Sequence, residues 1–398
     1  MPVFFGAVAG QLHVAFLPAP GAGEPPEQPF AEHELLTANG SNFRVPQVNF
    51  YRALQTRDPQ TIARAVALTF MGVRTEKWPE RRLRDLSVFF SQIDYKATGE
   101  WKEEIVFFNP QKKLPTLTPT LPDGTAVRLR PDQDARRVFA DWLTQPKNPW
   151  FSANITNRIW SWLLGRGIVE EPDDMRPENP PCNPELLAYL QRELIASHYN
   201  LKHVYRLVLD SRTYQLSSIP QGRSEEAAAN FAYYPVRRLD AEVLIDALCQ
   251  MTGSTEQYSS AVPEPFTVMP ERARAISLPD GSITSAFLEL FGRPPRDTGL
   301  ESERNNRPSA AQRLHLLNST HVQRKIEQSE ALKSLAREAK NPRSVVDGVY
   351  LMVLSRYPTP EEAAQVRAYS ASGAVKPWEA VVDLTWALIN TSEFLYRH

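Results

Sequence analysis

The sequence predicts a mainly α protein, an irregular multi-helical array with a minor β element near residues 100–130. Three observations predict this fold class. Apolar residues recur every three or four positions along most of the chain, which is the spacing of an amphipathic helix. Several of these stretches begin with a capping residue followed by proline. Proline is abundant, with 34 residues against 17 glycines, which is typical of short helices joined by rigid loops.

The first predicted helix begins at the pair Asp58-Pro59, a capping residue and a proline suited to the first helical turn. Its apolar stripe runs from Ile62 to Phe70, and Gly72 is the expected stop. A second short helix is expected near residues 81–93.

The β element is predicted in GEWKEEIVFFNP, residues 99–110, with Thr125 to Pro131 as its possible partner. The proline- and threonine-rich segment between them reads as a surface loop. A domain boundary is therefore expected near residue 130.

The remainder is predicted to be helical, with helices over 134–143, 151–164, 201–209 and 237–251. Other helix starts carry capping signals, namely Asn183-Pro184, the capping box of Ser309 and Gln312, and that of Thr359 and Glu362. The last helix has a stripe formed by Trp378, Val381, Leu384 and Leu388.

Composition limits the classes of partner. The formal net charge of −1 gives no overall attraction to nucleic acid or anionic lipid. No apolar run is long enough to span a membrane. The two cysteines, Cys182 and Cys249, have neither metal-site nor haem-attachment spacing, so they form one disulfide or are two unrelated thiols.

Four blocks of the chain resemble, in the expected order, the C-terminal domain of large exported planctomycete-type proteins that carry cytochrome c modules, domain of unknown function 1553. The blocks are NPWFSANITNRIWSWLLGRGIVEEPDDMRPENPPCNPELLAYL, YPVRRLDAEVLIDAL, FLELFGRPPRDTGLESERNNRPSAAQRLHLLNS and ALINTSEFLYRH. The resemblance implies an exported or periplasmic protein of bacteria that degrade complex polysaccharides.

The stretch from GSNFRVPQVNFYRAL to FFSQIDYKATGEWKEEI resembles the end of a companion family, domain of unknown function 1549. It begins partway through that domain, so we expect an N-terminally truncated chain without a clear signal peptide. The expected organisation is a linker or non-native start over 1–29, a truncated C-terminal part of the companion domain over 30–130, and the helical C-terminal domain of unknown function over 131–398.

In many relatives a segment similar to FMGVR precedes a Cys-x-x-Cys-His motif, which attaches c-type haem. Here FMGVR is followed by TEKWPERRLRDL, which contains no cysteine or histidine. We therefore expect no haem and no other cofactor.

The first candidate site is a carboxylate-rich loop with four acids, which could bind Ca²⁺ or could pair with Arg166 and Arg176 as a structural loop. Its acids are Glu170, Glu171, Asp173 and Asp174. Asn154, Asn157 and Arg158 share a face of the preceding helix. They form either a buried polar network that ties the helix to this loop or a ligand-binding face.

The second candidate site is an arginine-rich segment. It contains Arg293, Arg296, Arg304 and Arg307, mixed with Glu301 and Glu303. It is either a loop fixed by ion pairs or a site for an anionic sugar or sulfate. The spacing of His315 and His321 does not favour a helical zinc pair, and no metal site is expected. The tryptophan cluster of Trp142, Trp150, Trp160 and Trp162 favours a core position over a sugar-stacking platform.

No catalytic motif is present. The sequence therefore predicts an uncharacterised helical module of an exported assembly, with a scaffold or interaction role linked to polysaccharide-degrading systems. Its expected partner is another exported protein or a surface glycan, and nucleic acid is not expected. The alternative is a metal-dependent or anionic-glycan-binding carbohydrate-active protein, whereas the absence of the haem motif disfavours electron transfer.

Overall fold

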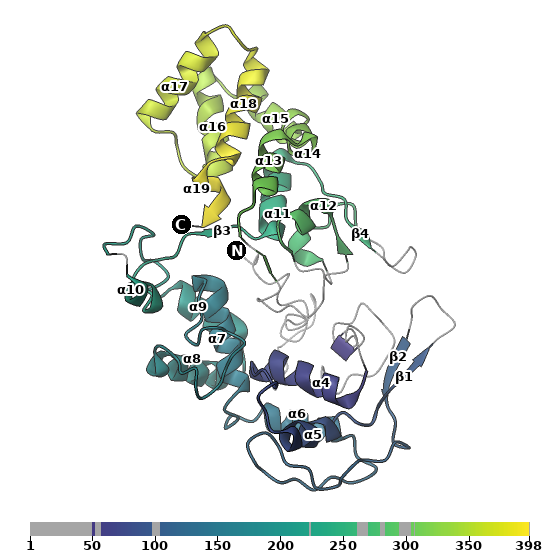
Figure 1. Ribbon diagram of the computed structural model, residues 1–398. Helices are drawn as coiled ribbons and strands as arrows, with labels where there is room; N and C mark the ends of the chain where they lie inside the picture. The colour runs from purple at the N-terminus through teal and green to yellow at the C-terminus, as the bar shows by residue number, and fades with distance from the viewer. Residues whose placement is uncertain are drawn as a thin grey trace. The chain divides into compact units, whose positions relative to one another are not determined.

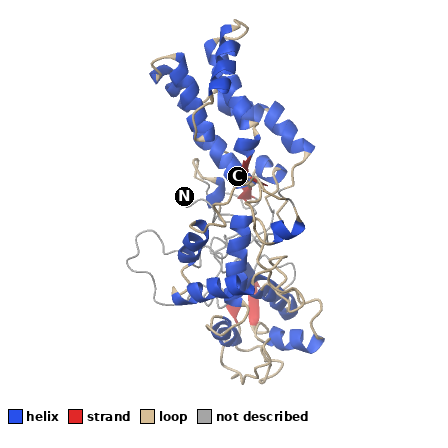
Figure 2. Ribbon diagram, turned by 90° about the vertical axis from the view of Figure 1, so that its left-hand side faces the viewer, coloured by secondary structure: helices blue, strands red, loops and turns tan. Residues whose placement is uncertain are grey.

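The structure is a computed structural model, which describes residues 50–51, 57–97, 104–222, 224–260, 270–278, 283–293, 304–305 and 307–397. Within these residues helices dominate and the strands are few, short and antiparallel, so the predicted fold class is confirmed (Figures 1 and 2). The chain divides into two compact units at residue 235. The predicted start segment, 1–29, lies outside the described residues.

The N-terminal unit, whose described residues lie between 50 and 235, holds seven of the labelled helices. They are α4 (Pro59–Val66), α5 (Glu80–Val88), α6 (Ala135–Leu143), α7 (Phe151–Leu164), α8 (Pro184–Ala196), α9 (Leu201–Leu209) and α10 (Glu225–Ala229). A π-helical turn, Ala67–Met71, extends α4 and ends at Gly72. The Asp58 carboxylate caps α4 by accepting bonds from the backbone N–H groups of Gln60 and Thr61.

The predicted strand exists, but its predicted partner is wrong. The strand β2 (Glu104–Phe108) pairs antiparallel with β1 (Ile93–Ala97), and Ile93 lies opposite Phe108. The 125–131 stretch contributes only an isolated bridge between Thr120 and Ala126. Strands that are neighbours in sequence usually pair, and the prolines of the 115–131 loop remove donors that a longer ladder would need.

Helix α7 forms the centre of the N-terminal unit. Every α7 residue except Trp162 is buried, and the helix packs against α8, α9 and the π-helical turn. Of the four clustered tryptophans, Trp142 and Trp160 are buried, and the Trp142 ring nitrogen donates to Asp123 over 2.7 Å. The rings therefore serve mainly as core.

The C-terminal unit, whose described residues lie between 236 and 397, contains the remaining labelled helices and two pairs of short strands. Its helices are α11 (Ala241–Thr252), α12 (Ala286–Leu290), α13 (Ala310–Asn318), α14 (Thr320–Glu327), α15 (Glu330–Glu338), α16 (Pro342–Leu354), α17 (Pro360–Ala371), α18 (Pro377–Ile389) and α19 (Ser392–Leu395). Its strands β3 (Arg237–Arg238) and β6 (Tyr396–Arg397) pair, as do β4 (Ser259–Ser260) and β5 (Ile283–Thr284).

Capping explains several helix starts of this unit. Both predicted capping boxes, Ser309 with Gln312 and Thr359 with Glu362, are confirmed. Helix α11 begins at Ala241 rather than at the predicted residue 237, because Arg237 and Arg238 pair with the C-terminal strand β6. The core of the unit is formed mainly by α11, α12, α14, α16 and α18.

The predicted boundary near residue 130 lies within the N-terminal unit and stays a prediction. The thiols of Cys182 and Cys249 are both free. In the part of the chain that the structure describes, no helix combines the length and apolar character needed to cross a bilayer.

The burial of α7 gives a stability prediction. Ile159 is fully buried on this helix. Ile159→Asp should unfold the N-terminal unit, because an unpaired buried charge costs several kcal/mol, on the order of the whole stability of a domain. Thermal unfolding followed by circular dichroism measures this. Arg192→Asp at an exposed position of α8 is the control, and equal melting of both variants would contradict the prediction.

Candidate functional site

The carboxylate-rich loop between α7 and α8 is held by contacts within the N-terminal unit. Asp173 is buried and pairs with Arg158 at 2.6 Å. Asp174 pairs with Arg176, whose hydrogen bond holds the pKa of Asp174 below its ordinary value. Glu170 accepts the backbone N–H of Gly167 over 2.8 Å. No group of three or more potential metal ligands comes together among the described residues.

The polar residues of α7 join this helix to two other segments. Arg158 donates to the carbonyls of Leu68 and Thr69 in the π-helical turn, at 3.1 and 2.8 Å. Asn157 exchanges two hydrogen bonds with the backbone of Val169, at 2.9 and 3.0 Å. Asn154 Nδ2 donates to the Thr69 carbonyl over 3.0 Å, whereas its Oδ1 is buried without a hydrogen-bond partner among the described residues. The contacts of these three residues tie α7 to the π-helical turn and to the carboxylate-rich loop.

Gly72 lies at a point where the π-helical turn, α7 and the carboxylate-rich loop meet. Its φ of +64° favours glycine, and an added Cβ would lie 2.5 Å from Asn154 Oδ1 and 2.8 Å from Met175 Cγ. Its carbonyl accepts the Met175 N–H over 2.8 Å. The glycine that the sequence marks as a helix stop is therefore also required by close packing.

The arginine-rich segment, the second candidate site, is organised around a buried acid in the C-terminal unit. Arg293 and Arg304 both pair with Glu242 of α11, at 3.2 and 2.8 Å. Glu242 is 1% exposed, so its charge is compensated almost entirely by these two guanidinium groups. Arg307 is exposed, and Arg296 lies outside the described residues.

Sequence reasoning did not identify Glu242 or Asp246, although both are acids within an otherwise apolar helix. The buried Asp246 accepts the N–H groups of Ala275 and Ile276, at 2.7 and 3.2 Å. Burial raises the pKa of Asp246 above its ordinary value. An isolated acid on the apolar face of a predicted helix is the signal that could have found both residues.

A chain of ionisable side chains links the loop after α11 to α13 and α14. His321 bonds Glu256 over 2.8 Å through Nε2 and approaches His315 within 3.4 Å through Nδ1. Lys325 pairs with the same Glu256 at 3.0 Å. Burial and the neighbouring His321 lower the pKa of His315, whereas the hydrogen bond from His321 and the charge of Lys325 offset burial and leave the pKa of Glu256 lowered.

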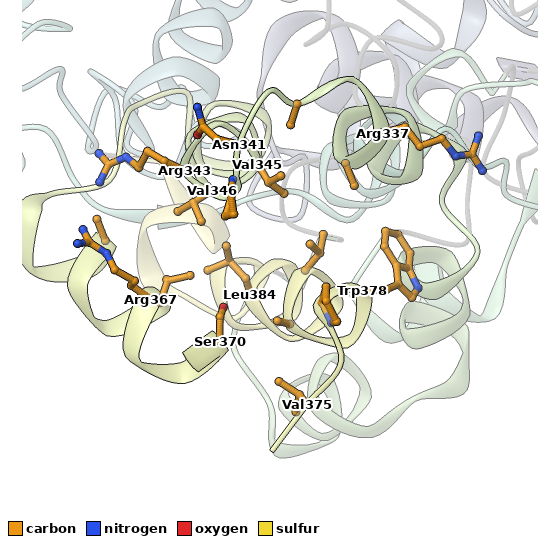
Figure 3. A pocket seen from close by; sticks show the side chains of 18 of the residues that line it. Arg337, Asn341, Arg343, Val345, Val346, Arg367, Ser370, Val375, Trp378 and Leu384 are labelled. Atoms are coloured by element: carbon orange, nitrogen blue, oxygen red, sulfur yellow. The ribbon is translucent and has the colours of Figure 1, made fainter. Parts of the chain in front are cut away.

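A concave surface with an apolar floor lies between α15, α16, α17 and α18, and we name it the α15–α18 groove (Figure 3). Its volume is about 1320 Å³. Val345, Val346 and Leu384 line it, and Trp378 and Val381 extend this floor along α18. These side chains pack against the core and are also partly exposed.

The charged residues that line the α15–α18 groove all carry positive charge. They are Lys333, Arg337, Arg343 and Arg367. Figure 3 shows Arg343 and Arg367 on one side of the apolar floor and Arg337 on the other, near Trp378. Sequence reasoning did not identify this groove, because its floor has the same residue types as a core.

The chain is a mainly α protein of two helical units, and the central helix of each unit carries a buried charge that is paired within that unit. The C-terminal unit also carries the α15–α18 groove. The sequence matches the family described as "PSD1: Protein of unknown function (DUF1553)" over residues 135–370. The chain belongs to this family. The match begins at the first residue of α6 and ends within α17. No curated protein and no solved structure matches the chain.

The buried ion pair of Arg158 and Asp173 gives a second stability prediction. Asp173→Ala should lower the free energy of unfolding by about 3–5 kcal/mol, because it leaves the Arg158 charge buried without its carboxylate. Urea denaturation of the full chain measures this. The double variant Arg158→Met/Asp173→Leu should be more stable than Asp173→Ala, and a double variant that is less stable would contradict the charge argument.

The lowered pKa of His315 gives a pH prediction. The unfolded chain binds a proton near the ordinary value of 6.5, whereas the folded chain binds it only at lower pH. Stability should therefore fall as pH falls below 6.5, and Glu256 should reinforce this loss at still lower pH, where its carboxylate is protonated.

His315→Gln should reduce the drop in melting temperature between about pH 7.5 and 5.5, because His315 no longer titrates. His198→Asn is the control, since His198 is exposed in the other unit and Asn tolerates its left-handed backbone. Identical pH profiles for wild type and His315→Gln would refute a contribution from His315.

Proposed function

We propose that the protein is a non-catalytic interaction module of an exported bacterial assembly, in which it holds another protein through the α15–α18 groove. Membership of the DUF1553 family supports the proposal that the chain is a module of the exported proteins that its sequence resembles. The resemblance to exported planctomycete-type proteins supports the association with polysaccharide-degrading systems. We also propose that residues 30–130 derive from the companion domain of unknown function 1549 and that the family is associated with cytochrome c modules.

The α15–α18 groove is the single observation that carries this proposal. The buried acids of the other two candidate sites are paired within their own units: Asp173 with Arg158, and Glu242 with Arg293 and Arg304. A metal-dependent or anionic-glycan-binding protein would need such groups to be open to a ligand. The groove, in contrast, leaves apolar side chains partly exposed beside positive charge, which is typical of a surface that a partner covers.

Site-specific photo-crosslinking in the producing organism tests this proposal. Ser370 is exposed and lines the groove, whereas Ala364 is exposed on α17 outside it. A photo-reactive amino acid at position 370 should trap one exported protein, which mass spectrometry identifies, and the same amino acid at position 364 should not. The trapped protein, purified separately, should bind wild type and lose affinity for Ser370→Trp, which fills the groove.

Two results would overturn the proposal. One is equal trapping from positions 370 and 364, which would show that the groove does not select a partner. The other is unchanged affinity of the purified partner for Ser370→Trp. Ala364→Trp is the matched control, because it adds the same ring to the same helix outside the groove.

A further inference from the structure

We propose that the α15–α18 groove binds an acidic amphipathic helix of the partner protein. This inference rests on the proposed function and specifies the chemistry of the partner segment. Three properties of the groove carry it: an apolar floor, a size that suits a helix, and an excess of positive charge.

The apolar floor lacks a full cover within the described residues. Trp378, Val381 and Leu384 recur on one face of α18 and line the groove, while Val382 and Leu388 of the same helix are buried in the core. Helix α17, which forms one wall, has a single buried residue, Ala363. A helix with so little buried surface gains stability when a partner covers its apolar side.

The size of the groove favours a helix over a small molecule. Its volume of about 1320 Å³ is larger than the range of roughly 300–1,000 Å³ typical of small-molecule pockets. An amphipathic helix fills such a groove with apolar side chains at positions i, i+3 or i+4, and i+7. The helices that form the walls leave room along the floor of valines and Leu384 (Figure 3).

Charge selects the kind of helix. No Asp or Glu lines the described groove, whereas four cationic residues do. Lys333 pairs with Glu330 and Arg343 pairs with Asp347, at 2.8 and 2.9 Å. Arg337 and Arg367 have no ion-pair partner within 4.0 Å among the described residues, and they lie on opposite sides of the floor in Figure 3. Carboxylates that flank the apolar face of a bound helix would meet both of them.

The experiment uses the full chain and a fluorescein-labelled amphipathic peptide that has leucines at i, i+3, i+4 and i+7 and glutamates on both flanks. A matched peptide carries lysine in place of each glutamate. Fluorescence anisotropy should show binding of the acidic peptide with an affinity that falls as salt rises. The basic peptide should bind at least about tenfold more weakly.

The double variant Arg337→Gln/Arg367→Gln should weaken binding of the acidic peptide by about three- to tenfold, the range expected for two exposed ion pairs. Arg313→Gln/Arg324→Gln removes two exposed arginines of α13 and α14, outside the groove, and should leave the affinity unchanged. Equal binding of the two peptides, or equal loss in the two double variants, would overturn the inference.

Two further arms distinguish this inference from the proposed function. Nile red, a neutral apolar dye, should bind wild type and lose binding in Ser370→Trp. If the dye behaves so but the acidic peptide does not bind, the acidic helix is wrong and the groove stays an interaction surface. If neither binds, both proposals fail.

The second arm uses phosphatidylglycerol vesicles. If the protein binds these vesicles more tightly than the peptide, and Arg337→Gln/Arg367→Gln loses this binding, the ligand is an anionic lipid and not a helix.

Discussion

The N-terminal unit depends on the buried guanidinium of Arg158. A helix that is buried on nearly every side, as α7 is, needs protein partners for most of its polar groups, because water cannot reach them. Arg158 meets this requirement by joining three elements at once: α7 itself, the π-helical turn through Leu68 and Thr69, and the carboxylate-rich loop through Asp173. The buried pair of Arg158 and Asp173 therefore joins the carboxylate-rich loop to α7.

The C-terminal unit uses the same principle with the signs exchanged. Its central helix α11 carries the buried acid Glu242, and the arginines come from the loop segments around Arg293 and Arg304. Asp246, one turn further along α11, holds the backbone of the 275–276 segment. In both units a buried charge on a central helix joins that helix to irregular segments. Such networks specify one arrangement of the loops, and breaking one partner is costly.

Local signals in the sequence determine the helix boundaries well. Asp58-Pro59, Asn183-Pro184 and the two capping boxes act within one turn, so neighbouring residues suffice to predict them. Pairing between distant segments is different. Strand β2 pairs with β1. The start of α11 depends on β6, which pairs with Arg237 and Arg238 and lies at the other end of the unit's sequence. Periodicity within a segment contains no information about which distant segment covers it.

The groove shows most clearly why the candidate site was harder to predict than the fold. Trp378, Val381, Leu384 and Leu388 form one stripe by sequence, yet Leu388 is buried while the first three line the groove. The hydrophobic pattern reports that a face needs cover, whether the cover comes from the same chain or from another one. Only the packing of α15 to α17 separates the two cases, because it leaves the first part of the stripe open. The apolar pattern does not indicate the charge of the covering surface. The positive residues on both sides of the groove do, because a negatively charged surface would complement them.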